Sequence, residues 1–272
     1  MFNMKNLYND SYRASQLSKF RNRHKNHFAN HIRLAKELVA EYGVSSPSRL
    51  LDLGCSIGTL ALEFALDGYD TIGLDSDPKA LSQGRKLARE LGCNPKWVCG
   101  DAGSFSLREK VDIIVCFDLL EHLSDAVIKK TLACIRENLK TNGVIVFHTF
   151  PTQYDHIFHK MALTCLPLIP FRYLSERRFE LLVRWYAKYL NIFYLIWYGK
   201  THNKIIANTV HPNPLSKERL QGVLKDAGFN LILLEMSLDS INPLKPYQGV
   251  LAKIFFSNQP VAYRSIWGVA IN

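Results

Sequence analysis

The strongest constraint on the fold is a short apolar run, within residues 49–60, that ends abruptly in two glycines. The run from Leu50 to Leu53 is too short for a buried helix and has turn-forming residues on both sides, so it predicts a buried strand. Gly54 and Gly58 follow, four residues apart. Because glycine has no Cβ, the backbone can approach a ligand there, and the N–H groups of the next helix point at that ligand. The segment therefore predicts a strand, a ligand-binding turn and a helix start.

The spacing of this turn separates two classes of ligand. A dinucleotide fingerprint reads G-x-G-x-x-G, and its pyrophosphate sits on the helix N-terminus. Here Ser56 takes the place of a middle glycine, and Asp52 lies inside the strand, where a carboxylate disfavours an anion. A cationic, amino-bearing ligand suits Asp52 better, and the alternative is an ordinary strand–helix turn. The stretch resembles motif I of the class I S-adenosylmethionine-dependent methyltransferases, which usually have glycine at the Ser56 position.

A second strand is predicted at residues 69–74 and ends in Asp75, 21 residues after Gly54. In a parallel α/β sheet, this spacing places the carboxylate at the carboxyl edge of a neighbouring strand, where an adenosine ribose could donate two hydroxyl hydrogen bonds. The next helix begins after Asp77, which we expect to be its N-cap. The segment Gly73–Pro78 resembles the second motif of the same family, which implies a ribose-binding role for Asp75.

Polar residues also follow the later strands. Lys96–Ala102 predicts a third strand that ends in Asp101, Val111–Phe117 predicts a central strand covered on both faces, and residues 143–149 predict a fifth strand. The resemblance implies that Asp101 and the N–H of Ala102 read the edge of an adenine. It implies a whole cofactor-binding set at these strand ends: Asp52, Gly54, Ser56, Gly58, Asp75, Ser76, Asp101, Ala102, Phe117 and His122.

Strands alternate with helices over residues 48–150, which predicts a doubly wound, mostly parallel α/β sheet. Gly228–Leu234 and Arg264–Ile271 look like the terminal antiparallel hairpin of the methyltransferase fold, so the resemblance implies a seven-stranded, Rossmann-like sheet. The expected parts are an N-terminal helical cap (1–44), an S-adenosylmethionine-binding core (45–150), a helical, aromatic lid insertion (151–210) and the C-terminal part of the core sheet (211–272). Within the superfamily, the chain is most similar to small-molecule enzymes of the ubiquinone-biosynthesis O-methyltransferase type, judged by Leu119–Leu123 and His211–Ser216.

Two segments carry the excess of positive charge. The net charge is +10, to which residues 1–40 contribute +6 and residues 155–204 contribute +5, so the rest of the chain sums to −1. Apolar residues recur at three- and four-residue steps over residues 12–42, which predicts one helix that ends at Gly43. In the resembled family such a helix lies over the cofactor and offers a basic side chain to the carboxylate of the cofactor. The resemblance implies that this side chain is Arg21, Arg23 or His24.

The insertion combines many aromatic and aliphatic side chains with arginines. We expect it to form a lid over a hydrophobic acceptor and to contact an anionic membrane surface. A small helical core with solvated charged faces is the alternative. The cysteines lack C-x-x-C spacing, which favours reduced thiols and a cytoplasmic protein, and no run approaches the roughly 20 apolar residues of a spanning helix.

The expected chemistry is transfer of a methyl group from S-adenosylmethionine to a small, apolar acceptor, at a hydroxyl oxygen. Such a transfer needs alignment of the two molecules and removal of the hydroxyl proton. Histidine is the natural base near neutral pH, and we expect His211 or His156 to take the proton, whereas His148 lies within a strand and is expected to be a core residue. The favoured interpretation contains no metal ion and leaves the oligomeric state open.

Two other classes of function stay open. Asp118-x-x-Glu121-His122 resembles the metal-ligand spacing of small-RNA 2′-O-methyltransferases, with His156 or His159 as the last ligand. The basic segments would suit a phosphate backbone, but the aromatic insertion makes nucleic acid the less favoured partner. The third class is a catalytically idle binding protein, which would fail to bind the methyl donor.

Overall fold

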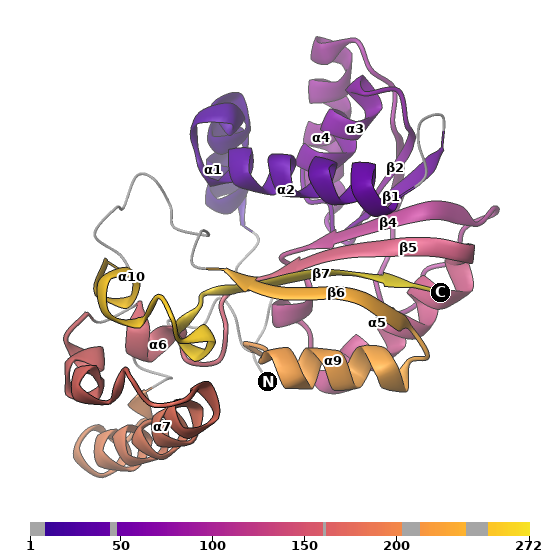
Figure 1. Ribbon diagram of the computed structural model, residues 1–272. Coiled ribbons are helices and arrows are strands. Elements are labelled where there is room, and N and C mark those ends of the chain that lie inside the picture. The colour runs from indigo at the N-terminus through magenta and orange to yellow at the C-terminus, as the bar shows by residue number, and fades with distance from the viewer. Residues whose placement is uncertain (1–8, 44–47, 160–161, 203–212, 238–249) are drawn as a thin grey trace.

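Seven strands form one sheet in the computed structural model, which describes residues 9–43, 48–159, 162–202, 213–237 and 250–272 (Figure 1). The strand order is β3-β2-β1-β4-β5-β7-β6, and β7 runs antiparallel to both of its neighbours. This order confirms the predicted doubly wound, mostly parallel sheet with an antiparallel edge. The strand bounds are Arg49–Leu53 (β1), Asp70–Asp75 (β2), Lys96–Cys99 (β3), Val111–Phe117 (β4), Leu139–Thr149 (β5), Asn230–Ser237 (β6) and Ser265–Ile271 (β7).

Helices cover both faces of the sheet, α2, α3 and α4 above it in Figure 1 and α5 and α9 below it. On one face, apolar side chains of α2 and α3 pack on β1, β4 and β5. On the other face, α5 and α9 supply the buried leucines and isoleucines. The bounds of these helices are His27–Tyr42 (α2), Thr59–Leu66 (α3), Pro78–Leu91 (α4), Asp125–Asn138 (α5) and Lys217–Asp226 (α9).

The predicted single helix over residues 12–42 is wrong, because two asparagines divide it. Helix α1 (Asp10–Arg21) ends at Asn22, the single turn η2 (Arg23–Lys25) follows, and α2 (His27–Tyr42) begins after Asn26. The Asn26 side chain accepts a hydrogen bond from the Phe28 N–H and donates one to the Lys19 carbonyl. Asparagine side chains that bind the backbone in this way favour caps over helix interiors. The break lets α1 turn onto α3 and α4, where Phe20 is buried.

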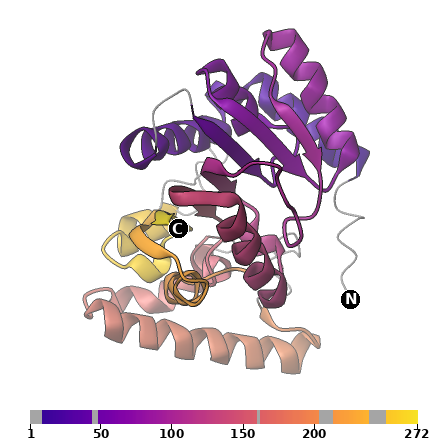
Figure 2. The ribbon, with the colours of Figure 1, turned by 90° about the vertical axis from the view of Figure 1, so that its right-hand side faces the viewer.

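The insertion, which follows β5 in the chain, has a hydrophobic core of its own. This core lies beyond one end of the sheet (Figures 1 and 2). Its elements are α6 (Asp155–Phe158), the 3₁₀ segment η4 (Ala162–Phe171) and the long helix α7 (Glu176–Tyr198). Helix α10 (Val250–Phe256) and the turn η5 (Pro260–Ala262), which we expected within the core sheet, pack on the insertion instead, and Phe256 contacts Phe158 and Phe179. The proposed divisions at residues 44, 150 and 210 stay predictions.

A buried ion pair ties this insertion to the sheet. Asp155, at the start of α6, accepts a hydrogen bond of 2.9 Å from Nε of Arg264, which directly precedes β7. Both side chains are buried. The Thr152 N–H and hydroxyl bind the carbonyls of Arg264 and Tyr263, so the same junction is also held by backbone contacts. None of the described helices is both long and apolar enough to cross a bilayer.

Candidate active site

The turn after β1 has the left-handed backbone that its glycines predict. Gly54, Ser56 and Gly58 have φ angles of +76°, +51° and +82°. The Gly54 N–H binds the Leu74 carbonyl at 2.8 Å, and the Gly58 N–H binds the Cys55 carbonyl at 2.7 Å. Left-handed φ angles are uncommon for residues other than glycine, which gives a physical reason for the glycine that the resembled family has at the Ser56 position.

The two glycines of the turn also leave room for neighbouring side chains. A Cβ on Gly58 would lie 2.3 Å from the Trp97 ring, and one on Gly54 would lie 3.0 Å from Leu119. Trp97, from β3, also touches Gly73 on β2 and Gly84 on α4, where a Cβ would lie 2.9 and 2.6 Å from the ring. Gly58 is therefore required for packing as well as for the turn, a role that its spacing in the sequence does not reveal.

Asp75 lies at the carboxyl end of β2, beside this turn. Its two carboxylate oxygens accept backbone hydrogen bonds from Ser56 at 2.7 Å and from Asp77 at 2.8 Å. Burial raises the pKa of the Asp75 carboxyl. Asp77 is the N-cap of α4, as predicted, and its other oxygen binds Arg13 at 2.8 Å, which fastens α1 over this edge of the sheet.

Asp52 lies under the turn. Its carboxylate is buried and accepts the Ala61 N–H at 2.9 Å, which joins β1 to the first turn of α3. Burial raises the pKa of this carboxyl to about 7.

Helix α1 brings a residue that the sequence reasoning missed. Burial, and then the charge of Asp75, raises the pKa of the Tyr12 hydroxyl to about 12, and the charges of Asp118 and Glu121 add to the effect. Acids at the carboxyl ends of β2 and β4 therefore act on the Tyr12 hydroxyl through their charge. The predicted cap residues lie elsewhere: Arg23 binds Glu63 of α3 at 2.6 Å, His24 lies 3.7 Å from the same carboxylate, and Arg21 is exposed.

The remaining predicted cofactor residues follow their strands at the same edge. Asp101 is exposed and caps its own turn through the Gly103 N–H at 2.7 Å, with Ala102 beside it half-buried. Ser76 is exposed after β2, and Phe117 is the buried last residue of β4. His122 is half-buried in η3 (Leu120–His122) and lies 3.9 Å from the Glu121 carboxylate.

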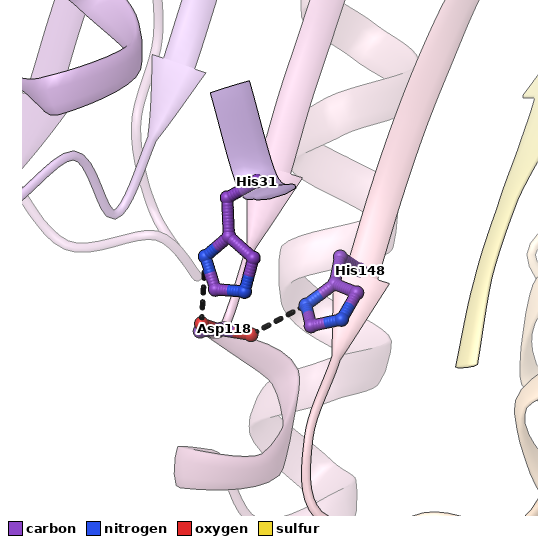
Figure 3. Close-up of side chains that lie close together, drawn as sticks. All are labelled: His31, Asp118 and His148. Carbon is purple, nitrogen blue, oxygen red and sulfur yellow. Dashed lines mark hydrogen bonds and ion pairs between the residues drawn. The ribbon is translucent and has the colours of Figure 1, made fainter. Parts of the chain in front are cut away.

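A cluster of His31, Asp118 and His148 lies at the carboxyl ends of β4 and β5 (Figure 3). Nδ1 of His148 lies 2.6 Å from one Asp118 oxygen, and Nδ1 of His31 lies 3.5 Å from the other. The two imidazole rings are 4.7 Å apart. His148 is buried, as expected of a strand residue, but it points at a carboxylate. The pairing of Phe117 with His148 across β4 and β5 follows from the predicted strands, whereas His31 comes from a helix far away in the sequence.

The predicted base His156 is not a member of this cluster. His156 is buried in α6 with its ring 5.2 Å from that of His202, and burial lowers its pKa to about 4. His211 lies outside the described residues. The assignment of either as the base stays a prediction.

The metal-ligand set of the RNA alternative does not assemble in the part of the chain that the structure describes. Glu121 is fully buried, accepts a hydrogen bond from the Thr149 hydroxyl at 2.9 Å, and has a pKa that burial raises far above its usual range. His159 binds the Ala262 carbonyl at 2.7 Å. Asp118 is joined by His31 and His148 rather than by Glu121, His122, His156 or His159.

Comparison with known proteins points to methyl transfer. Ubiquinone biosynthesis O-methyltransferase from Pasteurella multocida is 31% identical over 134 residues, which are 45% of this chain and 54% of the relative. The enzyme of the same name from Photobacterium profundum is 32% identical over 103 residues, 37% of this chain and 43% of the relative. The chain thus matches about half the length of these relatives.

Solved structures share the whole architecture at low sequence identity. A methyltransferase from Methanosarcina mazei, described as S-adenosylmethionine-dependent, aligns over 86% of this chain and 96% of its own, with a TM-score of 0.56 and 15% identity. A TehB-like methyltransferase from Corynebacterium glutamicum aligns over 96% and 98%, with a TM-score of 0.54 and 15% identity. The family model described as a methyltransferase domain matches residues 23–234, which is most of the chain. The chain therefore belongs to the methyltransferase-domain family.

Proposed function

We propose that this protein is an S-adenosylmethionine-dependent methyltransferase that methylates a hydroxyl oxygen of a small, apolar acceptor. Family membership and the relatives named O-methyltransferases support the reaction class. The observation that carries the proposal is the position of Asp75, held by two backbone N–H groups beside the left-handed turn at residues 54–58. When bound, S-adenosylmethionine supplies an electrophilic methyl group on a good leaving group.

The residues around Asp75 fit the adenosyl part of this cofactor. A carboxylate offers about four lone-pair sites, and the two backbone hydrogen bonds use one on each oxygen. The remaining sites can accept the two hydroxyls of a ribose. In this proposal Ser76 lies beside the ribose, and Asp101 with Ala102 contacts the adenine. The rest of the donor is enclosed by the turn at Gly54, Ser56 and Gly58, which has Asp52 beneath it. Phe117, at the end of β4, and His122 complete this part of the proposed site.

Replacing Asp75 by asparagine is expected to weaken binding of S-adenosylhomocysteine by about 1.5–3 kcal/mol, the range for a hydrogen bond to a charged group, or roughly 10- to 150-fold. Asparagine keeps an acceptor for one backbone N–H, so the loss of affinity measures mainly the contribution of the Asp75 charge. Isothermal titration calorimetry measures the effect. Asp70→Asn is the matched control, because Asp70 begins the same strand at the opposite edge and pairs with Arg49 and Lys96. Equal affinities in Asp75→Asn and the parent would remove Asp75 from the donor site.

We propose further that the insertion meets an anionic membrane surface. Among the described residues, the exposed large apolar side chains lie almost entirely on η4, α7, α10 and the turn between η4 and α7, with Leu66 and Ile232 as the exceptions. Ile196 and Trp197 are 74% and 70% exposed near the end of α7. Arg177, Arg178, Arg184 and Lys188 lie on the same helix. Exposed apolar patches rimmed by basic residues are typical of helices that lie in a membrane interface.

The membrane contact predicts binding to vesicles that contain anionic lipid, and loss of that binding at high salt. The double variant Ile196→Glu/Trp197→Glu is expected to reduce binding at least about tenfold, because burial of each large apolar side chain contributes about 1.5–3 kcal/mol. Leu66→Glu is the control, since Leu66 is exposed on α3, away from the insertion. Vesicle co-sedimentation measures all three proteins. The proposed contact would be contradicted if the parent protein bound neutral and anionic vesicles equally. Equal binding of the double variant and Leu66→Glu to anionic vesicles would contradict it as well.

A further inference from the structure

Three side chains from distant parts of the chain converge in Figure 3: His31 from α2, Asp118 directly after β4, and His148 near the end of β5. One ligand atom from each lies within 4.8 Å of the ligand atoms of the other two. Within the residues that the structure describes, this is the one group of histidine, cysteine and acidic side chains close enough together to hold a metal ion.

The donor atoms suit a transition metal. Two imidazole nitrogens with one carboxylate oxygen form a ligand set that divalent first-row metals adopt, whereas magnesium and calcium prefer oxygen ligands alone. The backbone of His148 is held by its pairing with Phe117 across β4 and β5, and its ring is held by the contact of Nδ1 with Asp118. Asp118 has a left-handed φ of +52°. Non-glycine residues rarely adopt this conformation, and such outliers gather at functional sites.

One side of the cluster is open. The side chain of His148 is 3% exposed, but those of His31 and Asp118 are 15% and 35% exposed. An ion held by three protein ligands with an open side keeps coordination positions for water or for a substrate oxygen.

The cluster also lies beside the proposed donor site. Leu119, the residue after Asp118, is the side chain that a Cβ on Gly54 would strike. An ion at the cluster would therefore lie close to the turn after β1.

We infer that His31, Asp118 and His148 bind one divalent first-row transition-metal ion. Its role rests on the proposed function. A hydroxyl oxygen of the acceptor binds the ion at the open side and releases its proton to water more readily there. That oxygen then forms a bond to the methyl carbon of the sulfonium, and the sulfur keeps the electron pair of the broken carbon–sulfur bond.

Metal binding is measured directly, without methyl transfer. Tag-free protein is stripped with a chelator and dialysed, then titrated with Co²⁺ by visible absorbance and with Zn²⁺ by calorimetry. We expect one ion per chain, with absorption bands of Co²⁺ bound to nitrogen and oxygen. His31→Asn, Asp118→Asn and His148→Asn are each expected to weaken binding at least about 100-fold, since loss of even an outer-shell partner costs 10- to 100-fold.

The controls separate this inference from misfolding and from the proposed function. His24→Asn removes an exposed histidine outside the cluster and is expected to keep the parent affinity. Thermal melts check that each variant folds, and Asp118→Asn keeps a residue type that tolerates the left-handed backbone. S-adenosylhomocysteine affinity is measured on the same samples. Parent protein that binds S-adenosylhomocysteine but no ion overturns the metal site alone, as does metal binding that survives all three variants. Metal binding without donor binding overturns the proposed function alone.

Discussion

Replacing Arg264 by methionine is expected to lower the free energy of unfolding by about 3–5 kcal/mol, the range found when one partner of a buried ion pair is removed. Arg264 and Asp155 are both buried, and their contact of 2.9 Å joins β7 to the start of α6. Methionine fills part of the space but leaves the Asp155 carboxylate without its cation. An isolated buried charge is far more unfavourable than a paired one, so the insertion loses part of its attachment to the sheet.

Urea unfolding, followed by circular dichroism, measures this loss. The control is Arg33→Met, which removes an ion pair of similar length, 2.9 Å to Glu37, on the exposed surface of α2. Exposed pairs of this kind contribute about 0.3–0.5 kcal/mol. The double variant Arg264→Met/Asp155→Leu removes both charges and is expected to recover most of the stability. Similar losses for Arg264→Met and Arg33→Met would show that burial does not set the strength of the Asp155–Arg264 pair.

Replacing Asp52 by asparagine is expected to stabilise the cofactor-free protein at pH 8 and to leave it unchanged below about pH 4. Burial raises the pKa of Asp52 from 3.8 to about 7 in the folded chain. The folded state therefore holds this proton more tightly than the unfolded state, and ionisation destabilises the fold progressively as pH rises between these two values. At about 1.4 kcal/mol per pKa unit, the full effect is roughly 4 kcal/mol. Asparagine carries no charge and still accepts the Ala61 N–H.

Urea unfolding at pH 4, 6 and 8 gives the measurement, and Asp112→Asn is a control of opposite sign. Burial acts to raise the pKa of Asp112, but hydrogen bonds from Lys140 and from the Arg49 N–H outweigh it and lower the pKa. Ionised Asp112 therefore stabilises the folded state above the unfolded pKa, and its loss should destabilise the protein at pH 8. A stability gain for Asp52→Asn that does not change with pH would show that the charge of Asp52 is not the cause.

Local patterns predicted the elements of the sheet well, because strand and turn signals depend on neighbouring residues. The run Val111–Phe117 became β4 with its predicted bounds, and Asp77 became the N-cap of α4. The same local reasoning failed between α1 and α2, because apolar residues keep a helical spacing across the break. The helix is broken there by hydrogen bonds from the Asn26 side chain to the backbone of Lys19 and Phe28. The spacing of apolar residues does not indicate whether an asparagine side chain makes such bonds.

The parts of the site that escaped prediction depend on contacts between distant segments. The strand order makes Asp118 and His148 neighbours once β4 and β5 are paired, but nothing in the sequence places His31 opposite them. Tyr12 comes near the candidate site because the break at Asn22–Asn26 changes the direction of α1. The incorrect prediction of one continuous helix therefore concealed this residue. The packing of α10 on the insertion is likewise set by tertiary contacts, such as Phe256 on Phe158 and Phe179.

The contacts of Trp97 restrict how this family member can vary. One indole touches Gly58, Gly73 and Gly84, and an added methyl group at any of the three would lie 2.3–2.9 Å from its ring. A substitution at one of these glycines is therefore compatible with the fold only if the residue at position 97 becomes smaller, and a smaller residue there leaves a cavity beside all three. Gly73 and Trp97 are therefore expected to be epistatic and to change together more readily than one at a time. Gly58 is restricted further by its left-handed backbone, and Gly84 by the Ile57 carbonyl oxygen, which would lie 2.8 Å from an added Cβ.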